Sequence, residues 1–124
     1  MGRHTESNND ESGNADAENA VIKCKDGSQV VLCGTGTLNI QANGKNGIKS
    51  GATPEDGEAS LTIRDLTLNI DAPVNDAVNA ETALEVEGGT LILSAGDDAL
   101  HCDYALNIGA EGTNGPSVTV TSCN

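Results

Sequence analysis

The sequence predicts an all-β protein, namely a right-handed, single-stranded parallel β-helix of about four coils with three short strands in each coil. Three observations lead to this prediction. Short segments alternate apolar and polar residues, a three-part phrase returns in the same order along the chain, and the composition is almost free of aromatic residues.

The clearest copy of the phrase is residues 90–108, TLILSAGDDALHCDYALNI. It holds three short apolar segments separated by two polar corners. Leu91 and Leu93 alternate with Thr90 and Ile92, and the third segment alternates in the same way. A period of two in pieces this short favours strands over helices.

Weaker copies precede and follow this stretch. The first segment recurs as 37–42, 67–72, 90–95 and 117–122. The corner recurs as Asn46-Gly47-Ile48, Asp76-Ala77-Val78 and Asp98-Ala99-Leu100, with Asn19-Ala20-Val21 as an earlier copy. The third segment recurs as Val30-Val31-Leu32, Leu61-Thr62-Ile63, Leu84-Glu85-Val86 and Leu106-Asn107-Ile108. The repeat is about 22 residues long, lengthened by loops.

A unit of this size cannot bury its own apolar side chains, whereas stacked coils bury them against the equivalent strands above and below. The predicted interior consists of columns of equivalent residues: Leu38, Leu68, Leu91 and Val118 in one, and Ile40, Ile70, Leu93 and Val120 in the next. An antiparallel sandwich permits the same alternation. It gives no reason for a three-part phrase to return in one order.

Composition limits both the core and the partners. The chain has 124 residues, 15 Gly, no Trp, no Phe and one Tyr, Tyr104, so the core is aliphatic and the length fits one domain. The formal net charge is -13. Nucleic acid is therefore disfavoured as a partner because phosphate binding relies on clusters of Lys and Arg, and cations are favoured.

The chain divides into two parts. Residues 1–18 are polar and acidic and predict a disordered tail, followed by the β-helix domain at 19–124. The tail lacks the apolar stretch of a signal peptide or a membrane span, so no membrane insertion is expected. Residues 50–60 and 109–116 are expected to be loops at the corners of coils.

The four cysteines are Cys24, Cys33, Cys102 and Cys123. An even count in a chain whose architecture suggests secretion favours disulfides, and the near pairs are Cys24 with Cys33 and Cys102 with Cys123. Free buried thiols are the alternative. No CxxC spacing supports a zinc site.

Three phrases resemble the bacterial surface carbohydrate-binding β-helix proteins, which are similar in fold to polysaccharide lyases. The phrases are GTGTLNIQANGKNGIKS (34–50), LTIRDLTLNIDA (61–72) and SAGDDALHCD (94–103). The resemblance covers about residues 30–122 and implies a secreted or cell-surface β-helix that binds calcium and plant-type polysaccharides such as cellulose or pectin.

The chain has fewer coils than is usual for that family. We therefore expect that it is a fragment of a longer helix, or that its open coil ends associate end to end in a structural or adhesive role.

The acidic corners are the predicted calcium site. Calcium takes six to eight oxygen ligands, and stacking would align corner residues of successive coils. The candidate ligands are Asp76, Asp97, Asp98, Asp103 and Asn46. Alternatively, Asn and Asp at these corners serve only as turn residues that hydrogen-bond backbone amides. That alternative is stronger for Asn46, because Asp97 and Asp98 are neighbouring carboxylates that repel each other unless a cation is present.

The candidate ligand-binding residues are Lys45, Lys49, His101 and Tyr104. A polysaccharide lyase needs a basic group beside calcium, so Lys45, Lys49 and His101 keep a lyase open as an alternative. They are also ordinary surface residues, and no nucleophile and base pair is evident. The sequence also permits ice binding on a column of outward threonines, Thr37, Thr67 and Thr90, although Ile92 and Thr119 interrupt the Asn column beside it.

We therefore expect a calcium-dependent module that binds polysaccharide outside a bacterial cell. Carbohydrate binding usually employs aromatic platforms, and Tyr104 is the only aromatic residue. This shortage favours an acidic sugar chain bridged by calcium.

Overall fold

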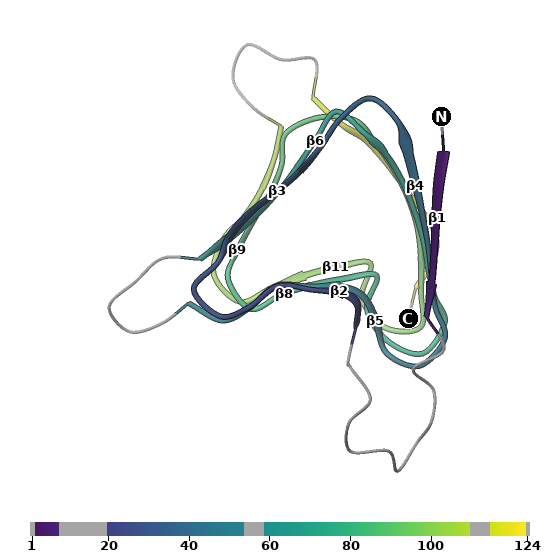
Figure 1. Cartoon of the computed structure of the whole chain (residues 1–124), viewed down its shortest axis with the longest axis horizontal. Helices are drawn as coiled ribbons and strands as arrows, with labels where there is room; N and C mark the ends of the chain where they lie inside the picture. Colours follow the sequence, from purple (N-terminus) through teal and green to yellow (C-terminus); the bar gives the residue numbers. More distant parts are fainter. Residues whose placement is uncertain (1, 8–19, 54–58, 110–114, 124) are drawn as a thin grey trace.

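The chain winds into a parallel β-solenoid with a three-sided cross-section (Figure 1). The computed structural model describes residues 2–7, 20–53, 59–109 and 115–123, and for residues 2–7 it describes the backbone alone. The strands form three parallel sheets and wind through about four turns. The predicted fold class is thereby confirmed.

Each side of the solenoid is one parallel sheet. Sheet A contains β1 (Gly2–Ser7), β4 (Thr37–Ala42), β7 (Thr67–Ala72), β10 (Thr90–Ala95) and β13 (Ser117–Ser122). Sheet B contains β2 (Ala20–Lys23), β5 (Asn46–Lys49), β8 (Val78–Ala80) and β11 (Leu100–Cys102). Sheet C contains β3 (Gln29–Cys33), β6 (Ser60–Arg64), β9 (Ala83–Val86) and β12 (Leu106–Ile108). Each coil runs from sheet B through sheet C to sheet A.

The register follows the repeats of the sequence. In sheet A, Thr67 pairs with Thr37 on one side and with Thr90 on the other. In sheet C, Leu61 pairs with Val30 and Leu84 in the same way. Equivalent residues of the phrase therefore stack directly, as predicted.

The predicted position of the first copy of the corner, Asn19-Ala20-Val21, is wrong by one residue. Ala20 pairs with Asn46 and Ile22 with Ile48, whereas we predicted that Val21 would align with Ile48. A shift by one residue exchanges the two faces of a strand. The observed register places the larger Ile22 in the column of Ile48, where it packs against the core.

Residues 2–7, expected within a disordered tail, instead form β1, which pairs in parallel with β4. A backbone ladder along an open strand edge needs no apolar pattern, so the polar composition of this stretch gave no sign of it. The remainder of the predicted tail, 8–18, lies outside the described residues, and the domain start at 19 remains a prediction.

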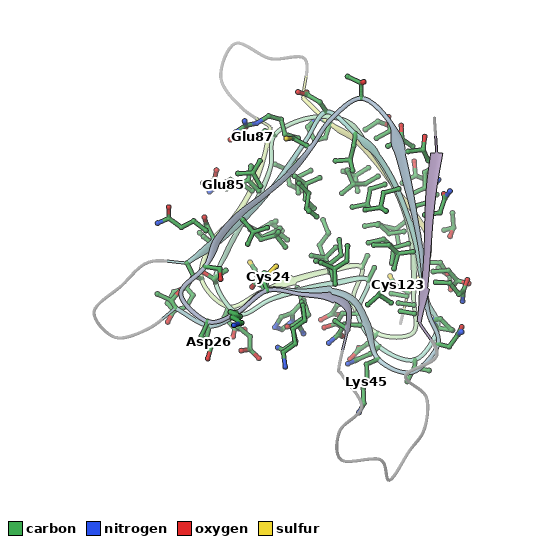
Figure 2. All side chains as sticks on the ribbon, viewed as in Figure 1. Cys24, Asp26, Lys45, Glu85, Glu87 and Cys123 are labelled. Atoms are coloured by element: carbon green, nitrogen blue, oxygen red, sulfur yellow. The ribbon has the colours of Figure 1, made fainter. Side chains whose placement is uncertain are left out.

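The inside of the solenoid is an aliphatic core, seen as carbon side chains between the three sheets in Figure 2. The two predicted columns are buried in the middle coils, with Leu68, Leu91 and Leu93 fully inaccessible to solvent. Val120, the last member of its column, is 44% exposed because it has a neighbouring coil on one side only.

Close stacking of the coils requires small residues at the corners. A Cβ on Gly96, at the corner between sheets A and B, would lie 2.1 Å from the carbonyl oxygen of Pro73 in the coil beneath. The N–H of Gly96 also donates to the carbonyl oxygen of Ala72 over 2.8 Å. The middle parts of the two predicted loops, residues 54–58 of 50–60 and 110–114 of 109–116, lie outside the described residues.

All four cysteines are free thiols in the structure, in place of the predicted pairs. Strand β3 separates Cys24 from Cys33, and a five-residue strand spans roughly 13–16 Å, beyond the roughly 7 Å between Cα atoms that a disulfide bridges. Cys102 pairs with Ala80 in sheet B. Both lie in the same inward-facing column of stacked residues as Cys24. Figure 2 shows Cys24 and Cys123 at opposite ends of sheet B, so Cys102 is likewise far from Cys123.

Candidate functional site

A ladder of short polar side chains runs along the corner between sheets A and B. The N–H of Asp76 donates to Oδ1 of Asn46 over 3.1 Å, and the N–H of Asp98 donates to Oδ1 of Asp76 over 3.0 Å. Asn46, Asp76 and Asp98 therefore stack in successive coils, as predicted. Asn46 and Asp76 also act as turn residues, because the side chain of each accepts a hydrogen bond from a backbone amide of the next coil.

A second column lies three residues further along each strand, on the outer face of sheet B. Lys49, Asn79 and His101 are in register there. Asn79 Nδ2 donates to Oδ2 of Asp76 over 2.5 Å, and His101 Nδ1 lies 3.1 Å from Oδ2 of Asp98. The spacing of three residues brings a corner carboxylate against the second residue of the strand that follows it.

These two columns meet in a cluster of three possible metal ligands. One ligand atom each from Asp76, Asp98 and His101 lies within 4.8 Å of the others. Asp76 is buried, whereas Asp98 and His101 are half-buried on the outer side. We name this set the Asp-Asp-His cluster.

His101 lies between two carboxylates, since its Nε2 is 3.0 Å from Oδ1 of Asp103 while Nδ1 faces Asp98. The hydrogen bond to Asp98 is the largest cause of a raised pKa for His101, followed by the hydrogen bond to Asp103. Partial burial opposes this rise. The imidazolium form is therefore favoured in the protein without a bound cation.

The structure distributes the remaining predicted metal ligands differently. Asp103 contacts His101 but does not belong to the cluster. Asp97 is exposed and lies outside it. Asn46 is buried, and its Oδ1 is occupied by the amide of Asp76. Their role as metal ligands stays a prediction.

The predicted ligand-binding residues are spread across sheet B. Lys49 shares the column of His101, and its Nζ is paired with the carboxylate of Glu81. Lys45 points away from the corner between sheets A and B (Figure 2). Tyr104 is 67% exposed at the other end of sheet B, where it borders a shallow depression with Thr53 and Ser60. Lys49 and His101 therefore share one column with Asn79 between them, whereas Lys45 and Tyr104 lie elsewhere.

His101 was predicted from the sequence as a ligand-binding residue and not as a metal ligand. The signal was present in the spacing, because Asp98 and His101 repeat the spacing of Asp76 and Asn79 one coil earlier. A carboxylate and an imidazole at this spacing lie close together because the corner leads directly into the strand.

The cluster has the chemistry of a divalent cation site. Both oxygens of Asp76 accept a hydrogen bond, but a carboxylate oxygen has a second lone pair with which it can bind an ion. Two carboxylates and an imidazole form a donor set suited to zinc or manganese. Calcium prefers oxygen ligands, and within the cluster Asp76 and Asp98 would supply them.

The described residues contain no helix long and apolar enough to cross a membrane. A sequence model of a protein family, described as carbohydrate-binding domain-containing protein, matches residues 3–122. No curated protein matches the chain. No solved structure matches it either.

Proposed function

Because the chain belongs to the family of carbohydrate-binding domain-containing proteins, we propose that it is a cation-dependent module that binds acidic polysaccharide. The observation that carries this proposal is the Asp-Asp-His cluster on the outer face of sheet B. The cation is divalent, and calcium is the ion that the sequence predicts. The module acts outside the cell, where such polysaccharides are found.

Charge explains why a cation is needed. The chain has a net charge of -13, so a polysaccharide that bears carboxylates is repelled by the protein alone. Asp103 adds a third carboxylate beside the cluster, because it contacts His101. Lys49, in the same column as His101, is already paired with Glu81. A divalent ion at the cluster replaces this repulsion by direct bonds to carboxylates of both partners.

The test is binding of an oligogalacturonide to chelator-stripped protein, measured by calorimetry with and without calcium, manganese or zinc. We expect binding only with a cation, and at least tenfold weaker binding in Asp98→Asn. Glu85→Gln is the matched control, because Glu85 lies on the outer face of sheet C (Figure 2). Binding that is equal with and without cations contradicts the proposal.

A second candidate function is end-to-end assembly, which the exposed apolar side chains of the last coil favour. Leu106, Ile108 and Val120 are 42%, 54% and 44% exposed at that end of the solenoid. For end-to-end assembly we expect light scattering to give a molar mass that rises with protein concentration in the wild type. The molar mass of Ile108→Lys should remain that of a monomer. A monomer at all concentrations removes this candidate.

A further inference from the structure

Two of the four cysteines occupy equivalent positions on sheet B at opposite ends of the solenoid. The strands of this sheet lie over one another along the solenoid axis (Figure 1). Cys24, on the first coil, is followed in one inward-facing column by Ser50, Ala80 and Cys102 on the last coil. Three strand spacings, roughly 14 Å, separate the two thiols, so they cannot form a disulfide within one copy.

We propose that copies of this chain join head to tail through a disulfide between Cys102 of one copy and Cys24 of the next. This inference rests on the end-to-end assembly given as the second candidate function, and it adds a covalent link. In a stack that continues sheet B, β11 of the first copy pairs with β2 of the second. The register of the repeat then places the two Cα atoms about 4.8 Å apart, within the roughly 4.4–6.8 Å that disulfides span.

The apolar side chains of the two ends match in the same register. Leu106 and Ile108 on β12 are 42% and 54% exposed. Val30 and Leu32, half-buried on β3, begin the two columns that Leu106 and Ile108 end. A second copy would therefore lay Val30 and Leu32 over these side chains, and the contact would remove apolar surface from water at both ends.

Charge favours this orientation but limits its strength. Lys25 follows Cys24, Asp103 follows Cys102, and both charged residues are exposed. Head-to-tail stacking sets Lys25 of the second copy beside Asp103 of the first. The two copies nevertheless repel each other overall, because each has a net charge of -13. A disulfide therefore stabilises an association that one ion pair and a small apolar contact leave weak.

Strand β1 occupies part of this contact. It pairs with the edge of β4, where Gly2 lies beside Thr37. In a continued solenoid β13 of the first copy takes that place, because Ser117 pairs with Thr90 in the column of Thr37. Joining therefore exchanges β1 for β13, and one parallel backbone ladder on β4 replaces another.

The link forms by exchange with a small-molecule disulfide such as oxidised glutathione. The thiolate of Cys102 attacks one sulfur of the oxidant and releases one glutathione thiolate. The thiolate of Cys24 of the next copy then attacks the sulfur of Cys102 and releases the second. Two protein thiols are thereby oxidised to one disulfide, and their two protons and two electrons end in two molecules of reduced glutathione.

The test is incubation of the full chain with oxidised glutathione, followed by non-reducing electrophoresis and mass spectrometry of proteolytic peptides. Each copy offers one Cys24 and one Cys102, so we expect a ladder of dimers and longer chains in which these two residues are linked. Cys24→Ser/Cys102→Ser should lose the ladder. Cys33→Ser/Cys123→Ser is the matched control and should keep it, although Cys33 and Cys123 are the more exposed thiols.

A mixing experiment tests the direction of the contact. In the control background that lacks Cys33 and Cys123, Cys24→Ser alone and Cys102→Ser alone should each stay monomeric. Their mixture should stop at a dimer, because each protein supplies one of the two thiols. Dimers of either variant alone would mean that like ends meet, and this result would overturn the proposal.

The exchange of β1 for β13 is tested by His4→Pro/Thr5→Pro. Successive N–H groups of a strand point to opposite sides, so one of the two prolines removes a donor that faces β4. The ladder should then form faster than in the wild type. An equal or slower rate overturns the exchange.

Links mainly through Cys33 or Cys123, or no link at all, overturn the proposal. Light scattering in reductant tests the end-to-end assembly itself, so assembly without a link between Cys24 and Cys102 removes the disulfide alone. A monomer in reductant together with no ladder in oxidant removes both. Binding of oligogalacturonide is measured separately and involves none of these cysteines.

Discussion

Asp76 has two tasks in the same position. Its Oδ1 accepts the amide of Asp98 in the next coil, while its Oδ2 accepts Nδ2 of Asn79 in its own coil. These two bonds fix the orientation of a buried carboxylate that also belongs to the Asp-Asp-His cluster. Stability and cation binding therefore depend on different properties of one side chain.

Two substitutions at this position separate the two tasks. Asp76→Ala should lower the free energy of unfolding by about 1–3 kcal/mol, because it leaves the amide of Asp98 without its acceptor. Asp76→Asn keeps an acceptor oxygen and should cost less, yet it should weaken cation binding because the charge is lost. Urea denaturation and calorimetry measure the two effects, and an equal loss of stability in both variants would contradict this division.

The position of His101 predicts a dependence on pH in the protein free of cations. Its folded pKa is raised above the ordinary value, mainly by Asp98. The stabilisation is therefore complete below about pH 6.5, the unfolded value, and is lost as the pH rises through the folded pKa. An NMR titration should show a lower pKa for His101 in Asp98→Asn than in the wild type. An unchanged pKa would mean that Asp98 does not hold the imidazolium.

The stacked column of Asn46, Asp76 and Asp98 was predictable because the corners repeat in the sequence. The contact between Asp98 and His101 was harder to predict. It depends on how sharply the chain turns into sheet B, and alternation alone does not give that angle. The predicted cysteine pairs were wrong for a similar reason. Cys24 and Cys33 are near each other in the sequence, but strand β3 holds them apart in space.

At the scale of elements, the corners hold the coils in register. The amides of Gly96 and Asp97 donate to carbonyl oxygens in the coil beneath, over 2.8 Å to Ala72 for Gly96 and 3.2 Å to Asn75 for Asp97. The absence of a side chain at position 96 permits this approach, because a Cβ would overlap the backbone of Pro73. The corner that precedes Asp98 therefore depends on a glycine.

Gly96→Ala should consequently disturb both the stacking of the coils and the Asp-Asp-His cluster. We expect a loss of about 1–3 kcal/mol or more in the free energy of unfolding, as for other overpacked sites. Gly88→Ala is the control, because its nearest atom is the side-chain oxygen of Asp65 at 3.2 Å, which can move. Thermal unfolding of both variants tests this, and a larger loss in Gly88→Ala would contradict it.

The strand register was largely readable from the sequence, except at the edges. The middle coils repeat the phrase clearly, whereas the first corner around Ala20 lacks a strong pattern and was misplaced by one residue. Strand β1 could not be anticipated, because its pairing with β4 is a backbone ladder and its residues do not alternate in polarity.

At the scale of the whole molecule, burial falls from the middle coils towards the ends. Leu93 is fully buried between two neighbouring coils, while Val120, in the same column, has one neighbour. A solenoid of this kind gains stability from each interface between coils, so the centre should open last.

A pair of substitutions in that column measures the gradient. Leu93→Ala should cost about 2–5 kcal/mol, the usual range for a buried leucine. Val120→Ala should cost well under half as much, because its side chain is already half in solvent. Chemical denaturation with matched conditions gives both values, and equal losses would mean that the last coil is covered in solution.

Cation titration of chelator-stripped protein in three forms, namely wild type, Asp98→Asn and Asp97→Asn, shows whether the Asp-Asp-His cluster holds a cation. Asp97 is the neighbouring carboxylate, and it lies outside the cluster. We expect saturable binding of calcium, manganese or zinc by the wild type and by Asp97→Asn, and an affinity at least tenfold lower in Asp98→Asn. Equal affinity in all three proteins, or no binding by the wild type, would contradict it.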